Sequence, residues 1–511
     1  MPISQLGQLN TTALQVADVY VQIVPPQFLL NGVPSSIVGL VGSASWGPKD
    51  QPVTVGNLNQ YAARFGTIKA RTFDMGTWAA VMLQQGATAL KCVRVTDGTD
   101  VAATIIAQTS CITFTSKYSG SLANSCQVSV GPGSKNGTFQ VRVAQPFSPP
   151  EIFDNIGFGL TANPLWVEIA RVINEGQNGM RSASELIVAT AGAGTTAPAT
   201  ATYTLTGGLD GSSGVDKDDL LGTDTASRTG MYSLRAQDCS LLALCDLTDH
   251  TAWATVDAFA QAEGMYAIVA GAAGQSITTG RSNKTSAGID TYTMKVMLGD
   301  YVFWHDTVNG ITRLVSPAAF VAGLLANLAP NQSSLNKRML GVVGTQKSMT
   351  GIPYTQADLQ DLAMGSIDVI ANPVPGGNYF GCRNGRNASS NPVIRGDNYT
   401  RMTNYIAATI SRGIGIYIGQ LQSADTRRRA KTTLDAFFAN LQQQGLIGTP
   451  SGRGDAFQTI LDDSNNPFNR VALGYMQADV KVTYLSVIEF FLVNIEGGQS
   501  VEITRAPSPL A

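Results

Sequence analysis

The pattern of apolar and polar positions divides the chain into segments that differ in periodicity and composition. Residues 1–18 are small and polar without a helical period, and residues 19–24 then alternate as a short strand until two prolines stop it. The next segments predict a buried strand, two helices that each end at a glycine, and a β-branched strand, at 36–41, 57–65, 78–85 and 89–95. This order is typical of a mixed α/β domain that follows a flexible arm.

The texture changes between about residues 97 and 206. Short strand-like runs alternate there with Gly, Ser, Pro and Thr, and one helix is predicted near 164–174. We interpret this stretch as an inserted, mostly β domain. The α/β texture then returns, with a strand, a crossover helix, a second strand and a buried helix capped by Ser-Pro, at 241–247, 252–262, 266–270 and 316–328.

The last third of the chain contains a helix from about 425 to 444, which a glycine ends. Its apolar residues fall at i, i+3, i+4 and i+7 and make one stripe, formed by Leu434, Phe437, Phe438 and Leu441. After the helix, Val480 and Val482 alternate with polar residues, and residues 487–495 are strongly apolar. A second short alternating strand at 501–504 lies close to the end of the sequence.

These patterns predict an α/β (α+β) multidomain protein. It has mixed-sheet core domains, a mostly β inserted domain, and extended arms at both ends. The predicted divisions are an N-terminal arm at 1–24, an α/β domain at 25–96 plus 207–345, the insertion at 97–206, a C-terminal core domain at 346–495 and a C-terminal arm at 496–511.

Composition narrows the function classes. Charged residues make up 14% of the chain and the net charge is −2, so the basic excess of a nucleic-acid-binding protein is missing. The six cysteines are scattered without a CxxC pair, which predicts buried thiols in a reducing compartment. We expect neither a signal peptide nor membrane insertion, because the sequence has no basic start and no run of about 20 apolar residues.

Candidate chemistry is sparse, and we expect no catalytic residues, no cofactor and no metal site. The two histidines are His250 and His305, and His305 next to Asp306 is the pair that most resembles a catalytic dyad; we interpret it as a loop or strand-end feature. No phosphate-binding GxxxxGK[ST] loop is present. The segment from Asp210 lacks the Gly and the acid of a calcium loop, which favours a solvated turn.

The basic side of the helix at 425–444 is the main charge cluster, with Arg427, Arg428, Arg429 and Lys431. Two interpretations stay open: a solvated helix face, or a docking surface for an acidic partner.

Several segments, taken in order, resemble the contractile tail sheath family of myophages, R-type bacteriocins and type VI secretion systems. They are the entry segment 38–66, the strand 89–95, the Gly-Gly-Leu-Asp-Gly junction within 205–211, the Pro-led helix 316–328 and the C-terminal region 425–495. In that last region the resemblance implies a turn at 445–448, a short helix at Ala456–Phe457 and paired terminal strands.

The resemblance implies a structural subunit rather than an enzyme. Terminal arms in this family add strands to a neighbour's C-terminal sheet, and the matching strand-like residues here are Val19, Val21, Ile23, Val501 and Ile503. It implies a homo-oligomer of stacked hexameric rings or a six-start helix around a tail tube, with the insertion outside, baseplate and tail terminator proteins as further partners, and no direct contact with nucleic acid.

Arg428, Arg429 and Lys431 are then candidates for the surface that faces the tube. The expected location is the virion, after assembly in the host cytoplasm. The alternatives are another self-assembling virion protein of capsid type and, from a different class, an α/β enzyme with a β insertion.

Overall fold

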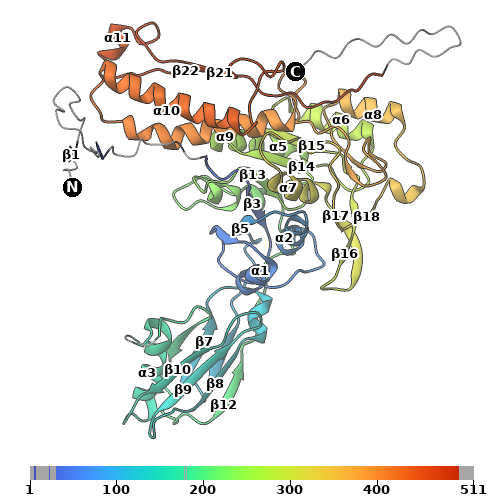
Figure 1. The fold of residues 1–511 in the computed structure, drawn as a ribbon. Coiled ribbons are helices and arrows are strands. Elements are labelled where there is room, and N and C mark those ends of the chain that lie inside the picture. Colours follow the sequence, from blue (N-terminus) through green and yellow to red (C-terminus); the bar gives the residue numbers. More distant parts are fainter. Residues whose placement is uncertain are drawn as a thin grey trace, which may run out of the picture.

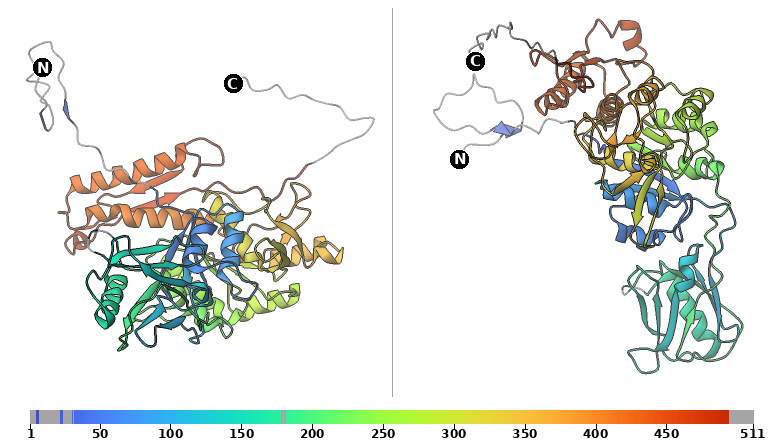
Figure 2. Two further views of the ribbon diagram at one scale, coloured as in Figure 1. Left: turned by 90° about the horizontal axis from the view of Figure 1, so that it is seen from below. Right: turned by 90° about the vertical axis from the view of Figure 1, so that its right-hand side faces the viewer.

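The computed structural model describes residue 30, residues 32–177, residue 179 and residues 181–493, together with two short strands, β1 (Gln5–Leu6) and β2 (Gln22–Ile23). The molecule is elongated and has an α/β architecture of three parts. A mixed sheet forms the middle, a mostly β unit lies at one end and a helical layer lies at the other (Figure 1). The two views in Figure 2 show the same arrangement from other sides.

A six-stranded sheet in the order β15-β14-β13-β3-β5-β4 forms the middle part. Every neighbouring pair is parallel except β4 with β5. The strands are β3 (Ile37–Gly42), β4 (Val53–Val55), β5 (Ala89–Arg94), β13 (Leu241–Leu244), β14 (Tyr266–Ala270) and β15 (Met294–Met297). Alternate residues of β3 point into two separate hydrophobic clusters, so both faces of the sheet are covered and its central strands are apolar throughout.

Helices make up much of these two clusters. Trp78 of α2 and Phe320 of α7 lie in one cluster, and Trp253 and Phe259 of α5 lie in the other. Ser316 caps α7, which is buried around its whole circumference as predicted. The helices are α1 (Leu58–Phe65), α2 (Met75–Gln84), α4 (Lys217–Leu221), α5 (Trp253–Glu263), α6 (Ile277–Ser286), α7 (Pro317–Asn327) and α8 (Gln356–Met364).

Two small antiparallel sheets extend the middle part. One has the order β17-β16-β18, and the other is the pair β19 with β20. Their strands are β16 (Val302–Asp306), β17 (Ile311–Val315), β18 (Val342–Thr345), β19 (Ile370–Ala371) and β20 (Gly381–Cys382). Leu362, Ile367, Val369 and Ala388 belong to the same cluster as α5, so this stretch of chain packs on the central sheet.

The segment between β5 and α4 folds into the mostly β unit, which is the lowest part of Figure 1. Two antiparallel sheets, in the orders β10-β9-β8-β12 and β11-β7-β6, enclose a core of their own with Phe114, Phe153 and Trp166. The elements are β6 (Thr104–Ala107), β7 (Ile112–Ser116), β8 (Gln127–Pro132), β9 (Phe139–Ala144), β10 (Glu151–Ile156), α3 (Ala162–Glu175), β11 (Ile187–Ala191) and β12 (Ala201–Thr204).

A buried arginine joins this β unit to the central sheet. The guanidinium of Arg94, at the end of β5, donates to the carbonyls of Gly47 at 2.8 Å, Ser119 at 2.9 Å and Asp210 at 3.0 Å. The carboxylate of Asp210 also pairs with Arg71 at 2.6 Å. Asp210 is therefore held in an ion pair, whereas Ser213, Gly214 and Asp216 of the same segment are exposed, so the prediction of a solvated turn is wrong for Asp210 and right for the later residues.

The helical layer contains α9 (Asp397–Gly413), α10 (Ala424–Gln443), α11 (Phe468–Val471) and the antiparallel pair β21 (Phe457–Ile460) with β22 (Asp479–Val482). The apolar stripe predicted on α10 is buried against Met402 and Ile406 of α9 and against Leu30. Amphipathic packing therefore holds the two long helices and the strand pair together.

Three predictions for this layer were wrong or incomplete. Residues 457–460 form a strand that pairs with β22, not the short helix predicted at Ala456–Phe457. Val480 and Val482 do lie in a strand, β22, but it pairs with β21 and not with a strand at its C-terminal side, since the described residues 483–493 form no strand. Helix α9 was not predicted at all. In the described part of the chain, no helix has the length and apolarity that crossing a membrane requires.

Candidate functional site

Both histidines contact neighbouring residues of the fold. Successive residues of a strand point to opposite faces, so the buried Asp306 accepts from Asn309 at 2.8 Å and Arg313 at 3.0 Å, whereas the exposed His305 lies 3.3 Å from the Thr312 hydroxyl. His250 packs edge-on against Trp253. Among the residues that the structure describes, no group of three His, Cys, Asp or Glu side chains is placed to hold a metal ion.

The six cysteines are all free and buried, as predicted. Burial raises the pKa of Cys126 and of Cys239 to about 12, so both thiols stay protonated at neutral pH. A nucleophilic cysteine needs the opposite shift, toward the thiolate.

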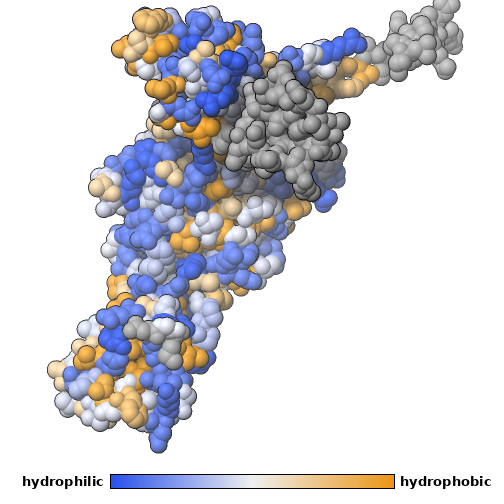
Figure 3. All heavy atoms as spheres, turned by 60° about the vertical axis from the view of Figure 1, so that its left-hand side comes forward, coloured by the Kyte–Doolittle hydropathy of each residue, from blue (hydrophilic) through white to orange (hydrophobic). Residues whose placement is uncertain are grey.

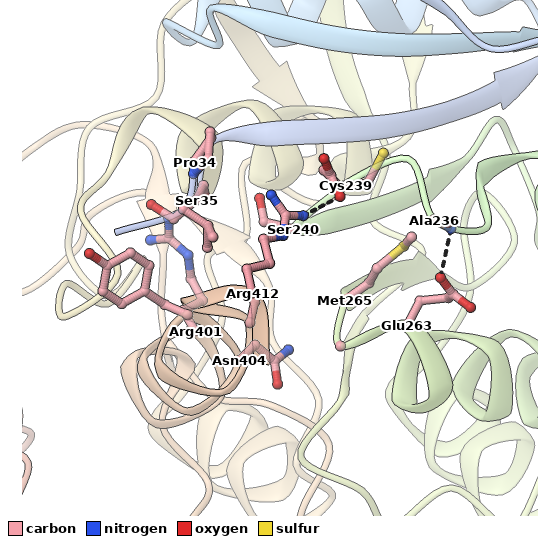
Figure 4. A pocket seen from close by; sticks show the side chains of 15 residues that line it. Pro34, Ser35, Ala236, Cys239, Ser240, Glu263, Met265, Arg401, Asn404 and Arg412 are labelled. Carbon is pink, nitrogen blue, oxygen red and sulfur yellow. Dashed lines mark hydrogen bonds and ion pairs between the residues drawn. The ribbon is translucent and has the colours of Figure 1, made fainter. Parts of the chain in front are cut away.

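A small cavity of about 100 Å³ lies between α9 and the amino ends of β3, β13 and β14 in the central sheet (Figure 4). Ser35, Cys239, Met265 and Arg401 line it, and Arg401 donates to the carbonyls of Leu328 and Ala329. Sites for small molecules usually measure about 300–1,000 Å³ and bring several polar groups together. We interpret this cavity as a packing seam between helix and sheet.

The three basic residues predicted to face a tube lie on the outer side of α10. The side chains of Arg428 and Arg429 are 74% and 60% exposed, and both lie within 4 Å of Asp425. Lys431 pairs with Asp435 at 2.7 Å. The side chain of Arg427, the fourth cation of the predicted cluster, is only 15% exposed and pairs with Asp463. The outer side therefore carries Arg428, Arg429 and Lys431 against Asp425 and Asp435, and is positive in a chain whose net charge is negative.

The strand pair of the helical layer is a sheet of only two strands. β21 pairs with β22, and neither pairs with another strand among the described residues. A groove of about 710 Å³ follows β22 and the residues after it along α9; Val482, Leu485, Tyr399 and Ile406 are among its lining residues. A two-stranded sheet is marginal by itself, and an unpaired edge next to a groove is a surface to which a further strand adds readily.

The described chain reaches the two ends of α9 before it continues into its termini. Leu30 packs against Gly413 at the carboxyl end of α9, and Glu489 pairs with Arg395 just before the amino end of that helix. A helix of 17 residues is about 25 Å long. The N-terminal and C-terminal segments therefore leave the body about 25 Å apart, from opposite ends of one helix.

The C-terminal tail exposes a run of large apolar side chains. Ile488, Phe490, Phe491, Leu492 and Val493 are between 60% and 85% exposed. Figure 3 shows apolar surface (orange) beside hydrophilic surface (blue) on the segment that projects at the upper right of the view. A contiguous apolar segment of this kind usually marks a surface that another chain covers.

Of the strand-addition residues predicted from sequence, Val19, Val21, Val501 and Ile503 lie outside the described residues. Ile23 lies in β2, which pairs in parallel with β1 within the N-terminal arm. Sequence reasoning missed Glu489, Arg386 and Arg395. The signal for Glu489 was its position as a single acidic residue inside the apolar run 487–493.

Comparison with known proteins identifies the fold. No family model matches the sequence, and no curated protein matches it either. Among solved structures, the sheath tail protein of Desulfitobacterium hafniense superposes with a TM-score of 0.56 at 17% identity, over 87% of this chain and 94% of that one. The sheath tail protein Lin1278 of Listeria innocua gives 0.60 at 14% identity, over 85% and 90%.

A third structure is the helical sheath of the anti-feeding prophage in its contracted state. It gives a TM-score of 0.55 at 13% identity and covers 95% of this chain and 99% of that chain. The likeness therefore extends over nearly the whole molecule, including the helical layer and the β unit.

Proposed function

We propose that this chain, which has the fold of contractile sheath proteins, is itself the subunit of a contractile tail sheath. It polymerises around a tail tube, and contraction of the polymer drives the tube through the envelope of a host cell. The observation that carries this proposal is the unfilled β21–β22 sheet together with termini that leave from opposite ends of α9. Each copy thus presents one acceptor and two donors of strands.

Strand addition links the copies in this proposal. The two terminal arms, 1–24 and 496–511, add to the sheets of neighbouring subunits. Their strand-forming residues are Val19, Val21, Ile23, Val501 and Ile503. The neighbouring subunit also covers the apolar tail that precedes the C-terminal arm. Each added backbone hydrogen bond contributes about 1 kcal/mol, so one arm is a modest contact, and durability comes from the number of linked contacts.

The finer arrangement is also part of the proposal. Subunits form stacked hexameric rings or a six-start helix, the β unit at 97–206 lies outside, and the C-terminal layer faces the tube with Arg428, Arg429 and Lys431 toward an acidic surface. Baseplate and tail terminator proteins close the ends. The chain works as a structural protein and not as an enzyme, since the energy of contraction is stored during assembly, and its location is the virion.

Electron microscopy of the purified chain tests the proposal. We expect hollow tubes or rings from the full chain, and a folded subunit without tubes after deletion of residues 1–24. A control variant with Asn10, Thr11 and Thr12 changed to Ala keeps the strand-like part of the arm and should still form tubes. Closed shells in place of tubes would favour a capsid-type protein, and a stable monomer under all conditions would refute polymerisation.

Charge reversal tests the side that faces the tube. Changing Arg428, Arg429 and Lys431 to Glu should abolish assembly on a tube while polymerisation without a tube persists. The matched control reverses three cations of the β unit, Lys135, Arg142 and Arg171. Assembly on the tube that survives the first reversal would contradict the assignment.

A further inference from the structure

A single carboxylate attaches the C-terminal tail to the body of the molecule. Glu489 Oε2 accepts from Arg386 Nη2 at 2.5 Å and from Arg395 Nη2 at 2.8 Å. The residues on either side, Ile488 and Phe490, are 75% and 80% exposed. Glu489 is therefore the residue that holds this part of the tail, since the apolar side chains beside it are mostly exposed.

The arginine site lies where two grooves meet. The groove along α9 and a second groove of about 720 Å³ beside α8 share several lining residues, among them Glu489 and Arg395. Arg383, Arg386 and Arg395 line the second groove, and among the described residues that line it Glu489 is the only acidic one. Without Glu489, three guanidinium groups would face this groove with no opposing charge.

The backbone holds the two binding arginines ready for a carboxylate. The amide of Asn387 donates to the carbonyl of Arg395 at 2.8 Å, and Arg386 forms a β-bridge with Gly396. The carbonyl of Arg386 also accepts from the buried ammonium of Lys295 at 3.0 Å. These contacts do not involve the tail, so they hold the backbone positions of both arginines side by side independently of Glu489, and the planar guanidinium groups suit a carboxylate.

Burial makes this contact stronger than an ordinary surface ion pair. The side chains of Arg386 and Glu489 are only 11% and 22% exposed, so solvent screens the pair less than an exposed one. The Nε groups of Arg386 and Arg395 are buried and have no hydrogen-bond partner among the residues that the structure describes. The hydrogen bonds from the two Nη2 atoms to Glu489 are therefore the contacts that balance the burial of these guanidinium groups.

We propose that the Arg386–Arg395 pair is a carboxylate-binding site whose ligand is Glu489 of the chain's own tail. The site anchors the tail at the amino end of α9 and fixes the point from which the C-terminal arm reaches a neighbouring copy. Its effect on assembly rests on the proposed function, but the anchoring itself does not.

Distance measurements on the isolated full-length subunit test the anchor. Spin labels are placed at Phe491→Cys in the tail and Gln360→Cys on α8, since all six native cysteines are buried. The parent should give one narrow distance distribution. Glu489→Gln should lose that narrow peak, with the detached population raised roughly tenfold or more, the ratio expected for losing a charge-assisted hydrogen bond.

Controls separate anchoring from a general effect on the tail. Ser486→Ala, in the same exposed tail, should keep the narrow peak. Glu489→Arg should lose it, and combining Glu489→Arg with Arg395→Glu should restore it. A narrow peak that persists in Glu489→Gln would overturn the proposal.

Polymerisation of the same variants tests whether anchoring of the tail affects assembly. We expect Glu489→Gln to lower the fraction of subunits in tubes, and Ser486→Ala to leave it unchanged. A detached tail with undiminished polymerisation would overturn the assembly part of the proposal. If the parent chain forms no tubes, the proposed function fails, and the distance measurement still decides whether Glu489 is an anchor.

Discussion

Replacing Lys295 by Met tests the buried ion network that joins α9 to the central sheet. Lys295 lies on β15 and is fully buried, and its ammonium contacts Asp368 at 2.7 Å, both oxygens of Asp397 at 3.2 and 3.3 Å, and the carbonyl of Arg386. Tyr266 donates to Asp397 at 2.6 Å. Methionine has a similar volume, so the change removes the charge without leaving a large cavity.

The expected loss of stability depends on the hydrogen bonds that Asp368 and Asp397 keep in the variant. Asp368 retains amide donors at 2.8 Å from Val369, Asn384 and Gly385, and Asp397 retains Tyr266. Both carboxylates nevertheless stay buried without the ammonium that they share, and the nearest remaining cation, Arg401, interacts with Asp397 and bonds to backbone carbonyls. Removing one partner of a buried pair costs about 3–5 kcal/mol, a large part of the roughly 5–15 kcal/mol that stabilises a typical domain.

The pH dependence distinguishes this mechanism from simple loss of packing. Burial acts to raise the pKa of Asp397, but the Lys295 ammonium and hydrogen bonds from Ser334 and Tyr266 outweigh it, so the pKa lies below its ordinary value of 3.8. This carboxylate therefore stabilises the parent above about pH 4, and the contribution is lost as pH falls further. In Lys295→Met burial dominates, the pKa rises, and the variant gains stability as pH falls from 7 toward 5.

Urea unfolding at pH 7 and pH 5 measures this effect, with tryptophan fluorescence reporting on the core through Trp78 and Trp253. We expect a difference of about 3–5 kcal/mol between parent and variant at pH 7 and a smaller one at pH 5. Lys284→Met is the matched control, because in the described part of the chain the Lys284 ammonium donates to the carbonyls of Gly365 and Ala388 and forms no ion pair with a buried carboxylate. A deficit below about 1 kcal/mol, or one that does not change with pH, would refute the reasoning.

Three further predictions concern other parts of the molecule. Desolvation lowers the pKa of Lys284 from 10.5 to about 8, so between these pH values the unfolded chain binds more protons than the folded one. The free energy of unfolding of the parent should therefore rise as pH increases from 8 to 10.5. Urea titrations of Lys284→Met should lack this gain. Phe438→Ala should destabilise the helical layer by about 3–5 kcal/mol, measured by calorimetry, whereas the exposed Arg428→Ala should change little. Arg94→Lys should lower the free energy of unfolding by about 2 kcal/mol, because one ammonium does not span the three carbonyls that the guanidinium binds. It should also speed proteolysis at the junction between the β unit and the central sheet, and unchanged cleavage would contradict this.

Helices with local signals were predictable from the sequence. Ser316 and the following proline marked the start of α7, and the stripe of α10 predicted which of its residues are buried. Helix α9 was missed because Asp397, Thr400 and Arg401 are polar yet buried in its first turns, which interrupts the apolar period. Asp397 pairs with Lys295, and Thr400 and Arg401 donate to backbone carbonyls of distant segments. A pattern of apolar positions does not report such pairing.

Features that depend on distant partners were not predictable. β21 has four residues, and its partner β22 begins about twenty positions later, so nothing local distinguished it from a helical turn. The predicted C-terminal core domain at 346–495 stays a prediction, but Leu362 and Ala388 within it pack in the central cluster. Glu489 was visible as an isolated acid, yet its partner Arg386 lies 103 positions earlier.

The course of the two termini along α9 has a mechanical consequence. In a polymer linked through its arms, tension passed from one neighbour to the next enters at one end of this helix and leaves at the other, parallel to its axis and to its backbone hydrogen bonds. The ion network around Lys295 stabilises the amino end of α9, beside which the tail is attached. The β unit, at the far end of the molecule, lies off this load path, so its size and surface are free to vary without weakening the link between copies.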